Sequence, residues 1–426
     1  MTAKEILTKA YSRMTELYAN KDTRYWNHSP NVQIQNRFYY EKQFLESNEL
    51  FLRYLELVGR MRAVARERGE HLVVKGVAAT SFIGYLLGTT DINPLKLHEY
   101  CPQCKFVSFT KEQISPFDKT YKKCNCSGEI VVDGHDIFFD SRSRSLSHEE
   151  IEVSVSKGFI NKAREMICEE FSDKTIITLK DEEEMSPIRL CFLDKEVGEN
   201  AEYPFNRSGE FLRYPEFLLA PAPYLDKCCE LEKATGIKME DAHSEDMMNV
   251  MLSFLNGDTN GIPEFECDYI KKLIEKTSPT DYDELLKIFG FVHGSNVWAN
   301  NADGLFAENR MTLAEIPAFW EDVYNEIAKR LVGNGIYEDG FAYEVAKKAK
   351  LGSYALNGEV DNITVSGLIS LGFNLDFIFF IEKVRYMFPK HHAIVCLKYA
   401  IAFMWYKIHY KAEFEQVMKG ESNDTK

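Results

Sequence analysis

The sequence has no uninterrupted apolar stretch of about 20 residues, the length that a membrane-spanning helix requires. Its two most apolar segments, VSGLISLGFNLDFIFFIEKV and AIVCLKYAIAFMWYKIHY, are interrupted by Asn374, Asp376 and Lys398, so we expect buried helices there. No apolar run follows the charges of the N-terminal MTAKEILTKAYSRM, which predicts no signal peptide. We therefore expect a cytoplasmic protein with reduced cysteines and no membrane partner.

Basic residues are outnumbered in this chain. It has 51 Lys and Arg against 66 Asp and Glu, which gives a net charge of -15. Proteins that coat nucleic acid are commonly basic overall, so the composition argues against a dedicated DNA-coating module. A basic groove on an acidic body stays compatible with it, because the local field matters more than the total charge. The length of 426 residues predicts two or three domains.

Four of the ten cysteines lie in one segment, CPQCKFVSFTKEQISPFDKTYKKCNCSG. They form a C-x-x-C pair and a C-x-C pair, at Cys101, Cys104, Cys124 and Cys126. Thiolates bind zinc tetrahedrally, and two short-spaced pairs joined by a loop make a closed structural site. The alternative is four free cysteines in a loop. We predict a structural Zn²⁺ site here and core packing for the other cysteines, including Cys228 and Cys229.

The first half of the chain mixes helical and strand patterns. Residues 1–70 have helical spacing, and HLVVKGVAATSFIGYLL has the strand, turn and helix order in which a loop can hold phosphate. The segment VVDGHD predicts two strands joined by a turn at Gly134, and the alternation of Ile151, Val153 and Val155 predicts a half-buried strand. Residues 71–225 therefore read as an α/β domain.

Residues 226–418 have almost entirely helical patterns. The capping-box pattern Thr312-x-x-Glu315 predicts a helix start, and Gly236 and Gly290 stand where helix ends are expected. The last eight residues, KGESNDTK at 419–426, predict a disordered tail. The predicted fold class is α+β, with a helical segment at 1–70, an α/β domain at 71–225 and an all-helical domain at 226–418.

Two polar sequence patterns are compatible with a functional site, one with metal binding and the other with nucleic-acid binding. Glu150 and Glu152 lie two residues apart on the predicted strand, so both carboxylates face one side, as in sites that hold two metal ions. An exposed strand face gives the same pattern. The segments FGFVHGSNVWANN and RYMFPKHHAI combine aromatic rings with His, Asn and Lys, which stack on bases and contact phosphates. The same composition also occurs in packed loops.

Six motifs occur in a characteristic order: KGVAATSFIGYLLGTTDINPL, CPQCKF…CNCSG, DGHDI, GIPEF, HGSNVW and YMFPKHHA. This order and spacing resemble those of the PolC-type DNA polymerase III α subunit, the replicative polymerase of low-GC Gram-positive bacteria. The resemblance runs from about Tyr39 to Lys411. It implies a palm of the nucleotidyltransferase type, reduced in size and carrying the zinc clip at 101–126, followed by helical fingers.

The resemblance also implies where catalysis would take place. The family carries an Asp-x-Asp pair and a third Asp that hold two Mg²⁺ ions. The pair resembles Glu150–Glu152 here, and the third position falls near Phe217–Ala220, where the nearest acid is Glu216. Each Glu carries one more methylene than Asp, which moves its carboxylate by about 1 Å. These three residues are therefore degenerate catalytic candidates.

The remaining implied sites concern binding. The family's Gly-Ser-rich triphosphate turn corresponds to Lys75–Thr80, which keeps one glycine. The residues implied to bind nucleotide or DNA are Lys75, Gly76, His293, Trp298, Arg385 and Lys390. A long palm stretch, the exonuclease domain, the oligonucleotide-binding domains and the clamp-binding tail have no counterpart in this sequence. We therefore expect a truncated, divergent relative.

Three hypotheses for function follow. The first is a pseudo-polymerase that binds DNA, a nucleotide or a replisome partner with little or no polymerase activity, a reduction that suits a mobile element, phage or defence context. The second is an active nucleotidyltransferase that uses Mg²⁺ at Glu150, Glu152 and Glu216. The third is an acidic structural or inhibitory protein that binds a replication, phage or host protein and never touches DNA.

Overall fold

The computed structural model of the protein describes residues 1–19, 30–109, 123–143, 146, 148–179, 186–194, 215–242 and 247–420. The chain divides into two compact units, Met1–Asp241 with Tyr410–Lys426 (unit 1) and Ala242–His409 (unit 2). The expected disordered tail lies outside the described residues from position 421 onward. In the part of the chain that the structure describes, no helix combines the length and apolar character of a membrane span.

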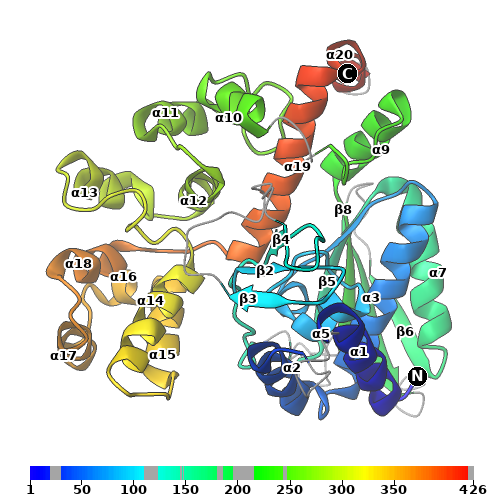
Figure 1. Ribbon diagram of the computed structural model, residues 1–426, viewed down its shortest axis with the longest axis horizontal. Coiled ribbons are helices and arrows are strands. Elements are labelled where there is room, and N and C mark those ends of the chain that lie inside the picture. The colour runs from blue at the N-terminus through cyan, green and yellow to red at the C-terminus, as the bar shows by residue number, and fades with distance from the viewer. Residues whose placement is uncertain are drawn as a thin grey trace. The chain divides into compact units, whose positions relative to one another are not determined.

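Unit 1 contains both helices and strands (Figure 1). Its helical elements are α1 (Ala3–Tyr18), α2 (Val32–Leu45), α3 (Glu49–Glu67), α4 (Val77–Thr80), α5 (Phe82–Leu87), η1 (Lys157–Phe159), α7 (Ile160–Glu170), α9 (Pro223–Thr235) and α20 (Lys411–Lys419). Its strands are β1 (Leu72–Val74), β2 (His98–Tyr100), β3 (Val107–Phe109), β4 (Val131–Asp133), β5 (Glu150–Val155), β6 (Lys174–Leu179), β7 (Ile188–Asp194) and β8 (Glu216–Pro221).

Five strands of unit 1 form the main sheet, in the order β1-β5-β8-β7-β6. β5 and β8 run parallel, and every other neighbouring pair is antiparallel. Strands β3, β2 and β4 form a second, smaller sheet. On β5, the side chains of Ile151, Val153 and Val155 are buried in the core, as their alternation predicts.

The N-terminal helices share one hydrophobic core with the main sheet. Tyr54 of α3 illustrates this, because its ring centroid lies 5.5 Å from that of Phe171, 5.8 Å from Phe192 and 5.7 Å from Phe217. The apolar side of α3 and the inner face of the sheet bury each other, so the N-terminal helices and the sheet belong to one compact unit. Within the same unit, α9 packs against α20.

Unit 2 is helical in the part that the structure describes, apart from isolated bridges between single residues. Its elements are α10 (Met247–Leu255), α11 (Asp268–Thr277), α12 (Tyr282–His293), η2 (Trp298–Ala302), α13 (Asp303–Ala307), α14 (Trp320–Gly333), α15 (Gly340–Lys350), α16 (Ser353–Asn357), α17 (Asn362–Ser370), α18 (Leu375–Lys383) and α19 (Lys390–His409). The α+β class and the helical C-terminal part are therefore confirmed.

Several local predictions were wrong. Gly134 does not join a hairpin, because β4 pairs with β2; a Cβ on Gly134 would lie 2.4 Å from the carbonyl oxygen of Lys96. Gly290 lies inside α12 rather than at its end, and a Cβ there would lie 2.8 Å from the carbonyl oxygen of Ala318. Both glycines permit close backbone approach. Thr312 hydrogen-bonds Glu315 as expected, but the segment is a turn.

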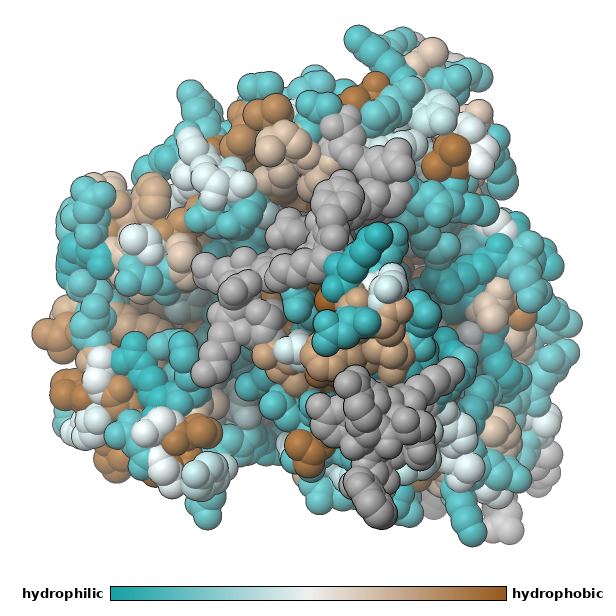
Figure 2. Space-filling view, viewed as in Figure 1, coloured by the Kyte–Doolittle hydropathy of each residue, from teal (hydrophilic) through white to brown (hydrophobic). Residues whose placement is uncertain are grey.

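Unit 2 exposes several large apolar side chains on α16, α17 and α18. Leu356 and Ile363 are each 84% exposed, and Leu375 and Phe379 are 55% and 47% exposed. Figure 2 shows apolar residues at the left edge of the view, where Figure 1 places α17 and α18. Exposed apolar side chains that gather in one region commonly mark a contact surface.

Candidate functional site

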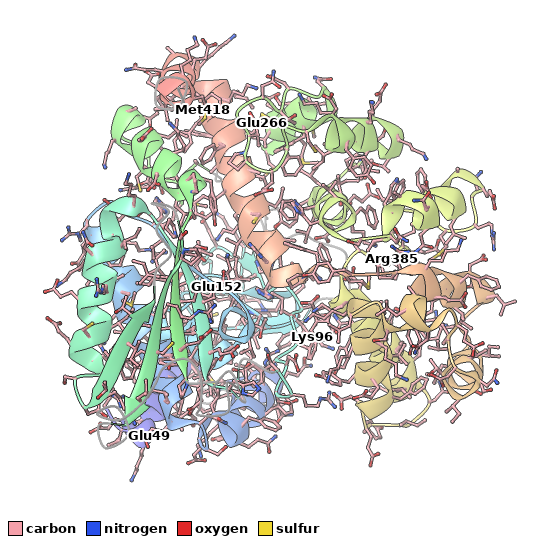
Figure 3. All side chains as sticks on the ribbon, turned by 180° about the vertical axis from the view of Figure 1, so that it is seen from behind. Glu49, Lys96, Glu152, Glu266, Arg385 and Met418 are labelled. Atoms are coloured by element: carbon pink, nitrogen blue, oxygen red, sulfur yellow. The ribbon has the colours of Figure 1, made fainter. Side chains whose placement is uncertain are left out.

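The three carboxylates predicted as catalytic candidates lie on one face of the main sheet. Alternation along β5 directs Glu150 and Glu152 away from the core, and alternation along β8 does the same for Glu216. The parallel register places Glu150 beside Glu216 and Glu152 beside Leu218. Figure 3, which views the molecule from the side opposite to Figure 1, labels Glu152 on this sheet. Two adjacent strands therefore contribute acids, as two-metal sites require.

Two of these carboxylates are engaged by cations of the chain itself. The ammonium of Lys75 lies 2.7 Å from Oε1 of Glu152. The guanidinium of Arg189, on β7, contacts both carboxylate oxygens of Glu216, at 2.5 Å in the case of Oε2. Lys75 is one of the residues that the sequence assigned to nucleotide binding, and here it neutralises a candidate metal ligand. Lys75 and Arg189 thus place positive charge next to two of the carboxylates that would hold metal ions.

The turn implied to hold a triphosphate connects β1 to α4. Gly76 has a φ of +67° and open space where a Cβ would be, so its backbone conformation requires glycine. The following residues, Val77–Thr80, are buried. The turn keeps its strand-to-helix geometry, and its one hydroxyl side chain, that of Thr80, donates to the carbonyl of Val77.

The next helix start is already occupied by an acid of the chain. The buried carboxylate of Glu41 accepts hydrogen bonds from the N–H groups of Phe82 and Ile83, at 2.8 and 3.0 Å, and from the hydroxyl of Ser81. Arg37 donates to the same carboxylate at 2.5 Å. Helix N-termini attract anions, and at α5 the anion is Glu41.

The four predicted zinc ligands converge in unit 1. Their sulfur atoms all lie within 4.8 Å of one another, with 3.5 Å between Cys101 and Cys126 and between Cys104 and Cys124. Tetrahedral zinc with bonds of about 2.3 Å separates its sulfurs by about 3.8 Å, so the cluster has the size of a Zn²⁺ site. All four cysteines are free thiols.

Two tight turns shape the cluster. Lys105 donates its N–H to the carbonyl of Cys101, and Ser127 donates to the carbonyl of Cys124; both donors have positive φ. A Cβ on Gly128 would lie 2.9 Å from the sulfur of Cys101, so glycine allows the second turn to approach the first pair. Burial disfavours the thiolate of Cys101, but N–H donors of Cys104 and Gln103 and the Cys126 thiol lower its pKa to about 7. Burial, together with the neighbouring thiols, raises the pKa of Cys104 to about 12, so without a metal the thiolate is favoured at Cys101 and disfavoured at Cys104.

In unit 2, the predicted binding residue Trp298 lies in the core, and His293 is half-buried. The Trp298 ring is 4% exposed and packs against Phe291 and Phe306, with centroids 5.0 and 5.6 Å away. His293, at the end of α12, lies against Phe289 with a centroid distance of 4.2 Å, and burial lowers its pKa. In this structure Trp298 supports the helices and offers no open face for a base.

The other two predicted binding residues are Arg385 and Lys390. Arg385 lies in the connection between α18 and α19, and Lys390 is the first residue of α19. Arg385 is exposed and labelled in Figure 3. The backbone N–H of Lys390 lies 3.1 Å from both carboxylate oxygens of Glu321. Burial raises the pKa of Glu321 to about 7. The Arg385 side chain is thus open to solvent, whereas the backbone N–H of Lys390 is held by Glu321.

Sequence reasoning missed Arg189 and Glu41. The alternation of Ile188, Leu190 and Phe192 into the core already directs Arg189 to the opposite face of β7. What the sequence does not contain is the pairing of β7 with β8, which brings Arg189 to Glu216. No sequence signal connects Glu41 to α5, since the contact depends on how α2 packs.

Comparison with known proteins identifies the relatives of this chain. Residues 224–339 match the bacterial DNA polymerase III alpha subunit finger domain. PolC-type DNA polymerase III of Caldanaerobacter subterraneus subsp. tengcongensis is 22% identical over 80% of this chain and 29% of its own length. The PolC-type enzyme of Pediococcus pentosaceus is 22% identical over 88% of this chain and 31% of its own length. That of Mycoplasma genitalium is 32% identical over 36% of this chain.

The chain spans about three tenths of the length of the first two relatives. The matches cover both units, and the finger-domain match begins within α9. The motif order in the sequence and these alignments agree. The chain is therefore a divergent relative of PolC-type DNA polymerase III, and its residues 224–339 are similar to the alpha-subunit finger domain.

Proposed function

We propose that this protein is a catalytically impaired relative of PolC that binds DNA or a nucleotide without extending a primer. Unit 1 takes the part of a reduced palm in this proposal, and unit 2 the part of the fingers. The observation that carries it is the pair of internal cations at Glu152 and Glu216. A two-metal mechanism needs carboxylates that are open to both ions, and here Lys75 and Arg189 compete with those ions.

A second feature of the sheet supports the same proposal. Leu218 pairs with Glu152 across β5 and β8, in the part of the chain where the family resemblance expects an aspartate. A leucine offers no metal ligand, so the acid on β8 is Glu216, beside Glu150. Misplacing a reacting group by about 1 Å commonly costs 10²-fold in rate.

The cysteine cluster has a structural role in this proposal. It binds one Zn²⁺ ion and holds together the two ligand turns, which lie between β2 and β4. Metal-binding free energy then contributes to folding. Mg²⁺ has no role in the impaired protein and would be needed only by an active one.

Templated primer extension tests this function. The wild type should extend no primer above background with Mg²⁺ or Mn²⁺, and Glu152→Ala should keep the fold and DNA binding. Extension by the wild type that disappears in Glu152→Ala would establish an active polymerase instead. The convergence of Glu150, Glu152 and Glu216 on one face is the observation that favours that alternative.

The exposed apolar side chains of α16–α18 favour a protein partner as a second candidate. In this case the chain binds a replication or phage protein. DNA affinity that is absent at low salt, together with a loss of partner binding in Leu356→Ser, would support it. DNA affinity that falls steeply with salt would support the first proposal.

A further inference from the structure

A second group of metal-ligating side chains lies elsewhere in unit 1, away from both sites described above. Cys228 and Glu232 are one helical turn apart on α9, so they share a face of the helix. His71 comes directly before β1. One ligand atom from each of the three residues lies within 4.8 Å of the other two. Cys228 and Glu232 are buried, at 0% and 8% exposure.

The three ligand atoms lie close enough together to surround a single small ion. Nε2 of His71 lies 3.1 Å from Oε1 of Glu232. With zinc bonds of about 2.0–2.3 Å, tetrahedral ligand atoms lie about 3.3–3.8 Å apart. A thiolate, an imidazole and a carboxylate are the three ligand types that zinc accepts. Three protein ligands leave the fourth position to water.

The carboxylate is held in place by further donors. The N–H of Met239 donates to Oε1 of Glu232 at 2.9 Å, and the ammonium of Lys238 contacts Oε2 at 2.8 Å. Although burial disfavours its charge, hydrogen bonds from His71, Lys238 and Met239 lower the pKa of Glu232 to about 2. Outer hydrogen bonds of this kind orient metal ligands. These contacts hold the Glu232 carboxylate with Oε1 directed at His71.

We propose that His71, Cys228 and Glu232 bind one Zn²⁺ ion, independently of the four-cysteine cluster. On binding, the Cys228 thiol loses its proton to solvent and its sulfur bonds to the metal. The ion replaces the direct hydrogen bond between His71 and Glu232. It ties α9, in which the finger-domain match begins at residue 224, to the residue that leads into β1. Loss of the ion frees α9 from the edge of the main sheet.

Metal content of purified variants tests this site. The wild type should bind about two zinc ions per chain, and Cys228→Ala about one. The matched control is Cys229→Ala, because the neighbouring sulfur lies near Glu70, with Sγ–Oε2 at 3.7 Å, and is outside the group of three. This control should keep about two ions. DNA binding and primer extension play no part in the readout, so failure here leaves the proposed function untouched.

A second variant guards against misfolding of Cys228→Ala. The His71 side chain is only partly buried, at 16% exposure, so His71→Gln should fold and should also lose one ion. Lys238→Gln should instead strengthen zinc binding, since it removes a competing cation from Glu232. One ion per chain in the wild type, unchanged in Cys228→Ala and in His71→Gln, would overturn the proposal and leave an ion-paired network without metal.

Discussion

The two groups of predicted metal ligands in unit 1 differ in what faces them. The four cysteines converge on one point, and their nearest partners are one another. On the sheet, Glu152 and Glu216 each meet a cation of the chain. The cysteine cluster has no internal cation to displace, whereas metal binding on the sheet requires that Lys75 and Arg189 first be displaced from Glu152 and Glu216. We therefore expect the four-cysteine cluster to bind a metal ion and the carboxylates on the sheet not to bind one.

The largest expected effect is at the cluster. Cys101→Ser and Cys126→Ser should each remove about one zinc ion per chain and lower the free energy of unfolding by on the order of several kcal/mol, because metal binding is coupled to folding. Metal analysis and thermal melting measure both changes. The control is Cys168→Ser, since Cys168 is exposed and outside the cluster. Unchanged zinc content and melting temperature in Cys101→Ser and Cys126→Ser would show that the cluster does not hold a structural zinc ion.

Glu321 in unit 2 has a third kind of carboxylate environment, which can be compared with those of Glu152 and Glu216. This side chain is buried and accepts a backbone N–H from Lys390, and burial raises its pKa from 4.5 to about 7. The folded state therefore holds the proton more tightly than the unfolded state. The stability from this group is present below about pH 4.5 and is lost as the pH rises to about 7, by roughly 3 kcal/mol.

Glu321→Gln isolates this contribution. Burial also lowers the pKa of His391 in unit 2 to about 3. This gives the opposite slope of stability against pH below about pH 6.5, so the informative quantity is a difference between two proteins. The unfolding free energy of Glu321→Gln minus that of the wild type should increase between pH 5 and 7. Exposed Glu338→Gln is the control. A difference that stays flat across this window would show that Glu321 is ionised in the folded protein.

A smaller effect is expected at Arg385, which sharpens the contrast between engaged and available cations. Arg189 is held by Glu216, whereas no described residue forms an ion pair with the exposed Arg385 side chain. Arg385→Glu should weaken DNA binding about 3- to 10-fold and reduce the slope of log affinity against log salt by about 1. Lys329→Glu, on a side chain that is 80% exposed, should change neither. Equal losses of DNA affinity in Arg385→Glu and Lys329→Glu would indicate that only the overall charge of the protein affects DNA binding.

Parts of this account could be read from the sequence. The period-two pattern of β5 places Glu150 and Glu152 on one face, and the short spacing of Cys101–Cys104 and Cys124–Cys126 predicts their convergence. Other parts depend on contacts between distant segments. The pairing of β7 with β8 decides that Arg189 meets Glu216, and helix packing decides that the Trp298 ring is buried. The sequence pattern of an aromatic residue near Asn and His is the same whether the ring stacks on bases or packs in a core.

Manganese binding tests the central claim most directly. Mn²⁺ prefers oxygen ligands over thiolates, so it reports on the sheet and not on the cysteines. The account predicts no Mn²⁺ binding by the wild type that depends on Glu152, and a gain of such binding in Lys75→Met/Arg189→Met, where the carboxylates are released. Two Mn²⁺ ions on the wild type, lost in Glu152→Ala, would contradict it, because the carboxylates would then be open to metal despite Lys75 and Arg189.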